Sequence, residues 1–319
     1  MRRIILAAAL AVAAITPAAA EYPDKPIRFI VPQAAGSNTD LYSRLIAQEM
    51  SKTLGQQLVI ENKPGAAFVV GLDAIAKAPP DGYTIGMGLI GGLAIAPHMV
   101  TKLPYDIEKD FQPIAQVSRA YLILAISPKS QLSSVKDILD YAKANPGKLS
   151  NASSATGSPG HVGAELFKSM AGVKITHVPY RGGAGAVNDL IAGHVDIMLE
   201  GLQSIAPHVR EGRVKAVAVS GATRSQAFPD LPTLAEAGVP GYEATTWLGV
   251  VAPAGTPRDI VNKLNKAVNE ALKAPAVAAQ FKMNGDEAVG GTPEAYGQLI
   301  KSDNAKWKDV VAQSGARLE

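Results

Sequence analysis

Short apolar runs alternate with longer amphipathic segments along most of the chain. The runs at residues 29–31 and 175–178, for example, are each followed by a glycine-containing turn and then by a segment with helical periodicity. Because strands and helices alternate in this way, right-handed crossovers predict an α/β fold with a largely parallel sheet and helices on both faces.

The first of these units is the most detailed. An apolar strand at 29–31 leads into a small-residue loop, which continues through Ser37, Asn38 and Thr39 into a helix that ends near Met50. The first N–H groups of a helix lack intrahelical partners and carry partial positive charge from the helix dipole. We therefore expect this turn to hold an anion such as a carboxylate.

The same order recurs twice further along the chain. The strand near Leu149 leads through a loop rich in Gly, Ser and Thr into a helix near His161, and the strand at 175–179 leads through Arg181 into a helix near Ala186. Three such helix starts could face one ligand. The alternative is that these turns only connect and cap elements, because every α/β protein has them and Ser and Thr are preferred helix caps.

Two stretches predict crossings between two lobes. Apolar strands at 113–117 and 122–127 flank a first crossing, and an apolar strand at 247–252 makes the second. This order predicts two doubly wound α/β lobes joined by two crossover strands. The expected division is residues 21–122 and 246–319 for a discontinuous first lobe, and residues 123–245 for the second.

Further segments are placed relative to this frame. The third strand of the first lobe, at 83–87, runs into a glycine-rich loop at 88–92, and this loop is expected at the carboxyl edge of the sheet, where α/β proteins bind ligands. The last three helices are expected to pack back onto the first lobe; they span residues 258–272, 275–283 and 293–314.

The first twenty residues have the composition of an export signal. Arg2 and Arg3 precede an apolar stretch at 4–15, and Ala18 to Ala20 provide small residues for cleavage after about Ala20. No later stretch reaches the roughly 18 apolar residues of a membrane span, so we expect no direct membrane insertion. The chain has no cysteine, which excludes both disulfides and a lipid anchor on cysteine.

The charge balance gives no support for nucleic-acid binding. The formal net charge is +3, and removal of Arg2 and Arg3 with the leader leaves 29 basic against 28 acidic residues. Nucleic-acid binding depends on clustered cationic contacts to phosphate, and no run of Lys and Arg is present.

Motifs for cofactors, metals and catalysis are incomplete. Residues 183–188 contain two of the three glycines of a dinucleotide fingerprint, and Ser158 lacks the flanking glycine spacing of a nucleophile elbow. His161 and Glu165 lie one helical turn apart, but two ligands are too few for a zinc site. We therefore expect no cofactor and no metal.

What remains is a set of polar, uncharged loops facing a cleft between lobes. The candidate ligand contacts are Gln33, Ala34, Ala35, Gly36, Ser37, Asn38, Thr39, Asp40, Phe68, Leu89, Ile90, Ser153, Ser154, Thr156, Gly157, His161, Arg181 and Asp196. Backbone N–H groups and hydroxyls of such loops hold small anions without trapping them in an ion pair.

Charged and apolar candidates have distinct expected roles. Arg181 either covers a second carboxylate or lies on the surface, whereas Asp40 and Asp196 are expected near the cleft, orienting backbone or water rather than meeting an anion. The apolar candidates 68, 89 and 90 give the ligand a hydrocarbon or aromatic body if they face inward. If they face the core, nothing follows about the ligand.

Several motifs follow one another along essentially the whole mature chain: Tyr22-Pro23-Asp24-Lys25-Pro26, Glu61-Asn62-Lys63-Pro64-Gly65, Pro80-Asp81-Gly82-Tyr83-Thr84, His177-Val178-Pro179-Tyr180-Arg181-Gly182, Pro229-Asp230-Leu231-Pro232-Thr233 and Ala252-Pro253-Ala254-Gly255-Thr256-Pro257. In these the chain resembles the substrate-binding receptors of tripartite tricarboxylate transporters, the Bug family.

The resemblance implies a type II periplasmic binding protein that closes two lobes on a carboxylate and delivers it to a membrane transporter. It also implies that the loops at 32–40 and 153–161 hold the ligand, largely through backbone groups and ordered water. Gln33 stands where an aromatic is common in the family, Phe68 where glycine is common, and Leu89 and Ile90 where polar residues are frequent. These departures favour a bulkier, less polar acid.

The expected function is a periplasmic, monomeric receptor for an organic mono- or dicarboxylate that works by hinge closure and hands its ligand to the membrane components of a tripartite tricarboxylate transporter. One alternative is a sensor that presents the carboxylate to a membrane signalling protein. An exported enzyme on the same fold would need a nucleophile or an acid and base pair, and Asp40, Asp196 and His161 lack that spacing.

Overall fold

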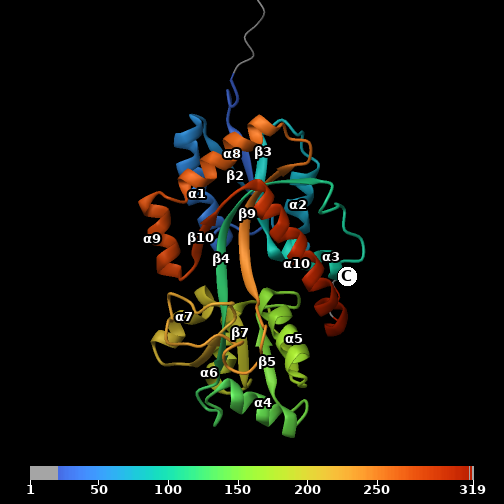
Figure 1. Cartoon of the computed structure of the whole chain (residues 1–319), viewed down its shortest axis with the longest axis vertical. Helices are drawn as coiled ribbons and strands as arrows, with labels where there is room; N and C mark the ends of the chain where they lie inside the picture. The colour runs from blue at the N-terminus through green and yellow to red at the C-terminus, as the bar shows by residue number, and fades with distance from the viewer. Residues whose placement is uncertain (1–20, 316, 318–319) are drawn as a thin grey trace, which may run out of the picture.

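Two α/β lobes are stacked along the long axis of the molecule and joined by strands β4 (Phe111–Ile126) and β9 (Thr245–Pro253) (Figure 1). This computed structural model describes residues 21–315 and 317. The expected export signal, residues 1–20, lies outside the described residues.

The first lobe contains the βαβαβ winding expected from its sequence. Its strands are β1 (Ile27–Val31), β2 (Leu58–Asn62), β3 (Thr84–Leu89) and β10 (Glu287–Gly290), together with β9 and the first part of β4. Their order across the sheet is β2-β1-β3-β9-β4-β10, and β1 pairs in parallel with both β2 and β3. Helix α1 (Asn38–Leu54) and helix α2 (Val69–Ala76) connect the three parallel strands.

The second lobe repeats the parallel arrangement on the far part of β4. Its strands are β5 (Ser150–Ser153), β6 (Thr176–Pro179), β7 (Ile197–Gly201) and β8 (Lys215–Val219). β5 pairs in parallel with β6 and β7, and β4 pairs antiparallel with β7 and β8. The helices of this lobe are α4 (Val135–Ala144), α5 (Pro159–Ala171), α6 (Gly183–Ala192) and α7 (Leu202–Arg210).

The three helices that end the chain are α8 (Arg258–Ala271), α9 (Pro275–Asn284) and α10 (Pro293–Ser314). α8 packs on α1 and β4, and α9 packs on α1, as expected for the first lobe. α10 packs on β4 as well, but it also contacts α5 of the second lobe, so the expectation for α10 was incomplete (Figure 1).

The prediction of a largely parallel sheet is wrong, because β9 pairs antiparallel with both β3 and β4. A chain that enters the second lobe along β4 has to return, and β9 is that return strand. The two strands expected around the first crossing are also one strand, since Ser118 to Tyr121 stay paired with β9. Strand β10, which pairs with β4, was not predicted.

The expected loop at 88–92 is also wrong in part. β3 extends to Leu89, and the chain continues as the short π-helix η2 (Gly91–Ile95) and the helix α3 (Ala96–Met99). Leu93 and Ile95 are fully buried here. Helical winding satisfies the backbone of this apolar segment internally, which an open loop would not do.

The core continues from one lobe to the other near the crossing strands. Trp247 of β9 packs edge-on against Tyr296 of α10, and its indole N–H donates to Asp303 Oδ2 at 2.6 Å. A Cβ atom at Gly249 would lie 2.2 Å from the Tyr296 ring, so only glycine fits there. These contacts fix α10 across the strands that join the lobes.

Candidate functional site

Two neighbouring cavities lie between the lobes. The larger, about 550 Å³ and here called the loop cavity, is lined by the loops that start α1 and α5, including Gln33 and Ser37 from the first lobe and Ser154 and Ser158 from the second. The smaller, about 230 Å³ and here called the hinge chamber, is lined by parts of β4 and β9 and by residues of both lobes.

The two cavities share part of their walls. Gln33, Phe68, Gly91 and Pro159 line both. A Cβ atom at Gly91 would lie 2.4 Å from the Phe68 ring, so the ring packs directly over this glycine. Phe68 and Gly91 therefore form part of the wall between the two cavities.

Phe68 has a backbone conformation that is uncommon for its residue type. Its φ is 73°, in the left-handed region, and Ala67 before it has a φ of 52°. Such conformations cost about 1–3 kcal/mol each and gather at ligand sites. The strained pair positions an aromatic ring where the two cavities meet.

The first-lobe loop ends in a capped helix start. Ser37 Oγ accepts from the Asp40 N–H at 3.2 Å, and the first intrahelical hydrogen bond of α1 runs from the Leu41 N–H to the Ser37 carbonyl. The N–H groups of Asn38 and Thr39 precede that bond, and both residues line the hinge chamber. Ser37 itself lines the loop cavity.

Asp40 holds this loop in shape. Its carboxylate accepts from the Gly36 N–H at 2.9 Å, from Asn62 Nδ2 at 2.9 Å and from Arg44 Nε at 3.0 Å. Burial raises the pKa of Asp40, but the hydrogen bonds from Arg44, Gly36 and Asn62 together outweigh it, so the pKa lies below its usual value. Asp40 is therefore ionised, and its carboxylate accepts hydrogen bonds from the protein rather than from a ligand.

The second-lobe loop is fixed in a similar way by a histidine pair. Ser158 Oγ accepts from the His161 N–H at 3.2 Å, and His161 Nδ1 accepts from the Gly157 N–H at 3.0 Å. The His161 ring stacks on His177 at 3.8 Å between centroids, and His177 Nε2 lies 2.7 Å from Ser153 Oγ. These rings support the loop from behind.

Burial keeps both rings neutral. It lowers the pKa of His161 to about 3, with His177 and Lys168 lowering it further. Burial and the Lys168 charge lower the pKa of His177 to about 4. Neither ring is a cation at neutral pH.

The structure brings most of the predicted contacts to the two cavities. Residues Gln33, Ala34, Ser37, Phe68, Ser154, Thr156 and Gly157 line the loop cavity. Residues Asn38, Thr39, Leu89 and Ile90 line the hinge chamber, together with Gln33 and Phe68. Leu89 and Ile90 are otherwise buried in the core, so the chamber meets only a small part of them.

Seven predicted contacts do not line either cavity: Ala35, Gly36, Asp40, Ser153, His161, Arg181 and Asp196. Arg181 is exposed. Asp196 accepts from the Ser150 N–H and Oγ at the amino end of β7, and the five-residue strand separates it from Gly201, which lines the hinge chamber. The expectation that Asp196 lies near the cleft is wrong, since it occupies the opposite end of its strand.

Two buried carboxyl groups in the hinge chamber were not predicted. Glu200 on β7 and Asp286 before β10 line it, and their exposed fractions are 9% and 7%. Their sequence neighbourhoods carry no motif, and only the pairing of the lobes brings them to one space. An acidic residue at the carboxyl end of an apolar strand, as Glu200 is, was the one available indication.

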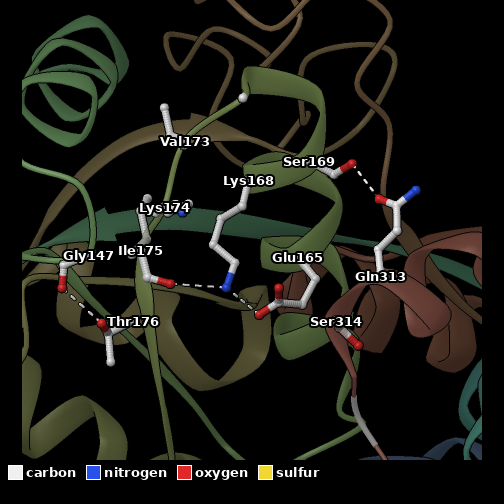
Figure 2. Close-up of a pocket in the computed structure, with 11 residues that line it drawn as sticks. Gly147, Glu165, Lys168, Ser169, Val173, Lys174, Ile175, Thr176, Gln313 and Ser314 are labelled. Carbon is white, nitrogen blue, oxygen red and sulfur yellow. Dashed lines mark hydrogen bonds and ion pairs between the residues drawn. The ribbon is translucent and has the colours of Figure 1, made fainter.

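A third cavity lies between α5 and α10, and Figure 2 shows several of its polar groups paired with one another. Lys168 Nζ lies 2.5 Å from Glu165 Oε1 and donates to the Ile175 carbonyl at 3.0 Å. Ser169 Oγ donates to Gln313 Oε1 at 2.6 Å, which joins the two lobes. We assign this cavity to the packing of α10 rather than to a ligand.

Within the described residues, no group of three or more His, Cys, Asp or Glu side chains is placed to hold a metal ion. A search of the same residues found no helix long and apolar enough to cross a membrane.

Two α/β lobes joined by paired crossing strands, with ligand-sized cavities between them, define the class of two-lobed solute-binding proteins. Residues 42–316 match the model of the tripartite tricarboxylate transporter family receptor, TctC. The chain belongs to this receptor family.

Relatives and solved structures agree with this assignment. The protein BugT of Bordetella pertussis is 36% identical over 93% of this chain and 92% of its own length. R. palustris Rpa4515 with adipate superposes with a TM-score of 0.81 at 36% identity and covers 93% of this chain and 100% of that one. MatC from Rhodopseudomonas palustris with bound malate gives 0.77 at 34% identity, over 91% of this chain and 100% of that one.

Proposed function

We propose that this chain is a periplasmic receptor that captures an organic mono- or dicarboxylate between its lobes and delivers it to the membrane components of a tripartite tricarboxylate transporter. The observation that carries the proposal is the loop cavity. Starts of two helices from opposite lobes line it, and its described lining residues include no acidic or basic side chain. The solved relatives hold adipate and malate, which are dicarboxylates.

The carboxylate is bound by dipoles rather than by a counter-ion. The candidate donors are the N–H groups of Asn38 and Thr39 at the start of α1, which line the hinge chamber, and the hydroxyls of Ser154 and Thr156, which line the loop cavity. Because Asp40 and His161 fix the two loops before ligand arrives, little ordering entropy is lost on binding. Phe68 gives the hydrocarbon part of the acid an apolar wall.

Closure would occur about the two crossing strands. β4 exchanges partners between Tyr121, which pairs with Thr245 of β9, and Leu122, which pairs with Gly201 of β7. This exchange supports a division into residues 21–122 with 246–319, and residues 123–245. A hinge there lets the two helix starts approach one ligand.

The test is a panel of mono- and dicarboxylates measured by thermal shift and by titration calorimetry. We expect at least one acid to raise the melting temperature by linkage, without being consumed. Ala34→Glu places a negative charge in the loop cavity and should weaken that binding about tenfold or more. Ala35→Glu is the matched control, because Ala35 is an exposed neighbour that lines neither cavity.

Equal weakening by both substitutions, or no response to any acid, would contradict the proposal.

We also propose that the chain is a monomer without enzymatic activity and that export removes its first 20 residues. Mass spectrometry of the exported protein should give an N-terminus at about Glu21. The alternative role, presentation of the carboxylate to a signalling protein, predicts loss of gene induction rather than loss of uptake when the gene is deleted.

A further inference from the structure

Phe68 lies on the boundary between the two interlobe cavities. Together with Gln33, Gly91 and Pro159, it lines both the loop cavity and the hinge chamber. Pro159 begins α5 of the second lobe, whereas the other three residues belong to the first lobe, so both lobes contribute to this boundary. Phe68 has the largest side chain of the four, and its ring is therefore the main obstacle to a molecule that extends from one cavity toward the other.

The ring packs over two glycines. A Cβ atom at Gly91 would have three Phe68 ring atoms as its nearest neighbours, at 2.4, 3.0 and 3.4 Å, and a Cβ atom at Gly92 would lie 3.3 Å from Phe68 Cβ. A side chain at position 91 would therefore push the ring out of its place. Leu72 and Ile75 of the following helix are fully buried, whereas Phe68 is half-buried, so part of this side chain stays outside the core.

The backbone conformation that places the ring is costly. Among the described residues, Ala67 and Phe68 are the only non-glycine residues with a positive φ. Glycine adopts such φ angles without a steric cost, whereas a bulky residue rarely does. Phe68 is the N-cap residue of α2 but makes no side-chain capping hydrogen bond, so capping does not account for it. Strained residues persist where the surrounding structure holds them, and they gather at ligand sites.

The two cavities differ in how well they suit an anion. The loop cavity has the hydroxyls of Ser154 and Thr156, and no acidic or basic side chain is among its described lining residues. The hinge chamber has the start of α1, but the buried acids Glu200 and Asp286 also line it, and an acidic neighbour disfavours a second carboxylate. A carboxylate is therefore better accommodated in the loop cavity, where the Phe68 ring limits the room left for the rest of the molecule.

We propose that Phe68 sets the length of the acid that this receptor accepts, by closing the loop cavity against the hinge chamber. The inference rests on the proposed function, because it takes a carboxylate in the loop cavity as the ligand. An acid whose body ends at the ring gains apolar contact with it, whereas a longer acid has to displace the ring from its packing over Gly91. Removal of the ring should join the two cavities, of about 550 and 230 Å³, and admit longer acids.

Two series of linear acids test this directly. Binding of butanoate through decanoate, and of succinate through sebacate, is measured by titration calorimetry at pH 7.5 on the wild type, Phe68→Ala and Phe68→Gly. In the wild type, affinity should fall steeply beyond one chain length. In both variants we expect this limit to move by about two or more methylene groups. The affinity of the newly admitted acid, relative to that of the best wild-type acid, should rise about tenfold or more.

The two substitutions also separate the ring from the backbone strain. Both remove the ring, but only glycine relieves the positive φ at position 68. Phe68→Gly should therefore melt at a higher temperature than Phe68→Ala, while the two variants share one length profile. Val70→Ala is the matched control, because Val70 is an exposed apolar neighbour that lines neither cavity, and this variant should keep the wild-type limit.

Each outcome decides between the inference and the proposed function. If acids bind but the wild type has no length limit, or both ring-less variants keep that limit, the inference is overturned and the proposed function stands. A limit that moves as far in Val70→Ala as in the Phe68 variants overturns the inference as well. If no acid binds to any of these proteins, the proposed function fails with it. A folding defect in Phe68→Ala leaves Phe68→Gly to decide, because glycine fits the backbone conformation.

Discussion

The loop cavity and the hinge chamber share part of their walls but differ in how the protein hydrogen-bonds the carboxyl groups beside them. In the loop cavity the ionised Asp40 lies behind the surface, where three donors satisfy it, and only dipoles face the ligand. In the hinge chamber Glu200 and Asp286 are among the lining residues, and each has one buried oxygen without a hydrogen-bond partner among the described residues. The comparison teaches that a buried carboxylate stabilises the fold when the protein satisfies it, and that its ionised form costs stability when the protein does not.

The largest expected effect comes from removing the satisfied acid. Asp40→Ala leaves the Gly36 N–H, Asn62 and Arg44 without their acceptor, and should lower the free energy of unfolding by roughly 2–4 kcal/mol. The loop at 33–40 loses its shape, so the carboxylate should bind about tenfold more weakly. Chemical denaturation and titration calorimetry measure the two effects.

Asp137→Ala is the matched control for that change. Asp137 also lies three residues after a serine helix cap, Ser134, and accepts from the Ser133 N–H at 2.9 Å, but it belongs to α4, away from both cavities. Asp137→Ala should lower stability by less than Asp40→Ala and leave affinity unchanged. Unchanged affinity in Asp40→Ala as well would show that the loop does not need Asp40 to hold the ligand.

A smaller loss of folding stability is expected at acidic pH, where His161 behind the second-lobe loop becomes protonated in the unfolded chain. His161 has a pKa of about 3 in the fold and about 6.5 when unfolded, so the unfolded chain binds more protons between these values. The stability that the neutral ring contributes is complete above pH 6.5 and is lost as the pH falls toward 3. At pH 4.5 the loss from His161 should be roughly 2–3 kcal/mol.

Melting curves of the wild type and His161→Gln between pH 7.5 and 4.5 measure this loss. The substituted glutamine keeps an acceptor for the Gly157 N–H but cannot be protonated, so the profile of this variant should fall less steeply. His194→Gln is the comparison variant, because His194 is exposed, pairs with Asp189 and lines neither cavity. Parallel profiles for all three proteins would remove His161 from the acid response.

The sequence predicts the loop cavity far better than the hinge chamber, for a physical reason. Ser37 and Ser158 each accept a hydrogen bond from the N–H group three residues downstream and so cap the helix that follows. Local chain geometry alone therefore places the two loops at helix starts. Glu200 and Asp286 meet only through the packing of two lobes, which no local pattern records. Asp196 was misplaced because apolar periodicity locates a strand without saying which of its ends faces the ligand.

Long-range pairing accounts for the errors in the fold as well. Ser118 and Arg119 suggested a break between two strands, yet Ser118 is buried opposite Leu248 and Arg119 forms an ion pair with Glu287 of β10. The four-residue β10 has little strand propensity of its own and forms because the edge of β4 is available.

The smallest effect is expected from Asp286→Asn, which should raise the stability of the fold at neutral pH rather than lower it. The pKa of Asp286 is about 6 in the fold against 3.8 for the unfolded chain, so the folded state binds more protons between these values. Its ionised form therefore costs stability above pH 6, and that cost disappears as the pH falls toward 4. Without ligand, the variant should be more stable than the wild type by roughly 1–2 kcal/mol at pH 7.5 and equally stable near pH 4.

Denaturation of both proteins at these two pH values measures the difference. A variant that is less stable at pH 7.5 without ligand would mean that the ionised carboxylate of Asp286 is already satisfied, and the contrast between the two cavities would be lost.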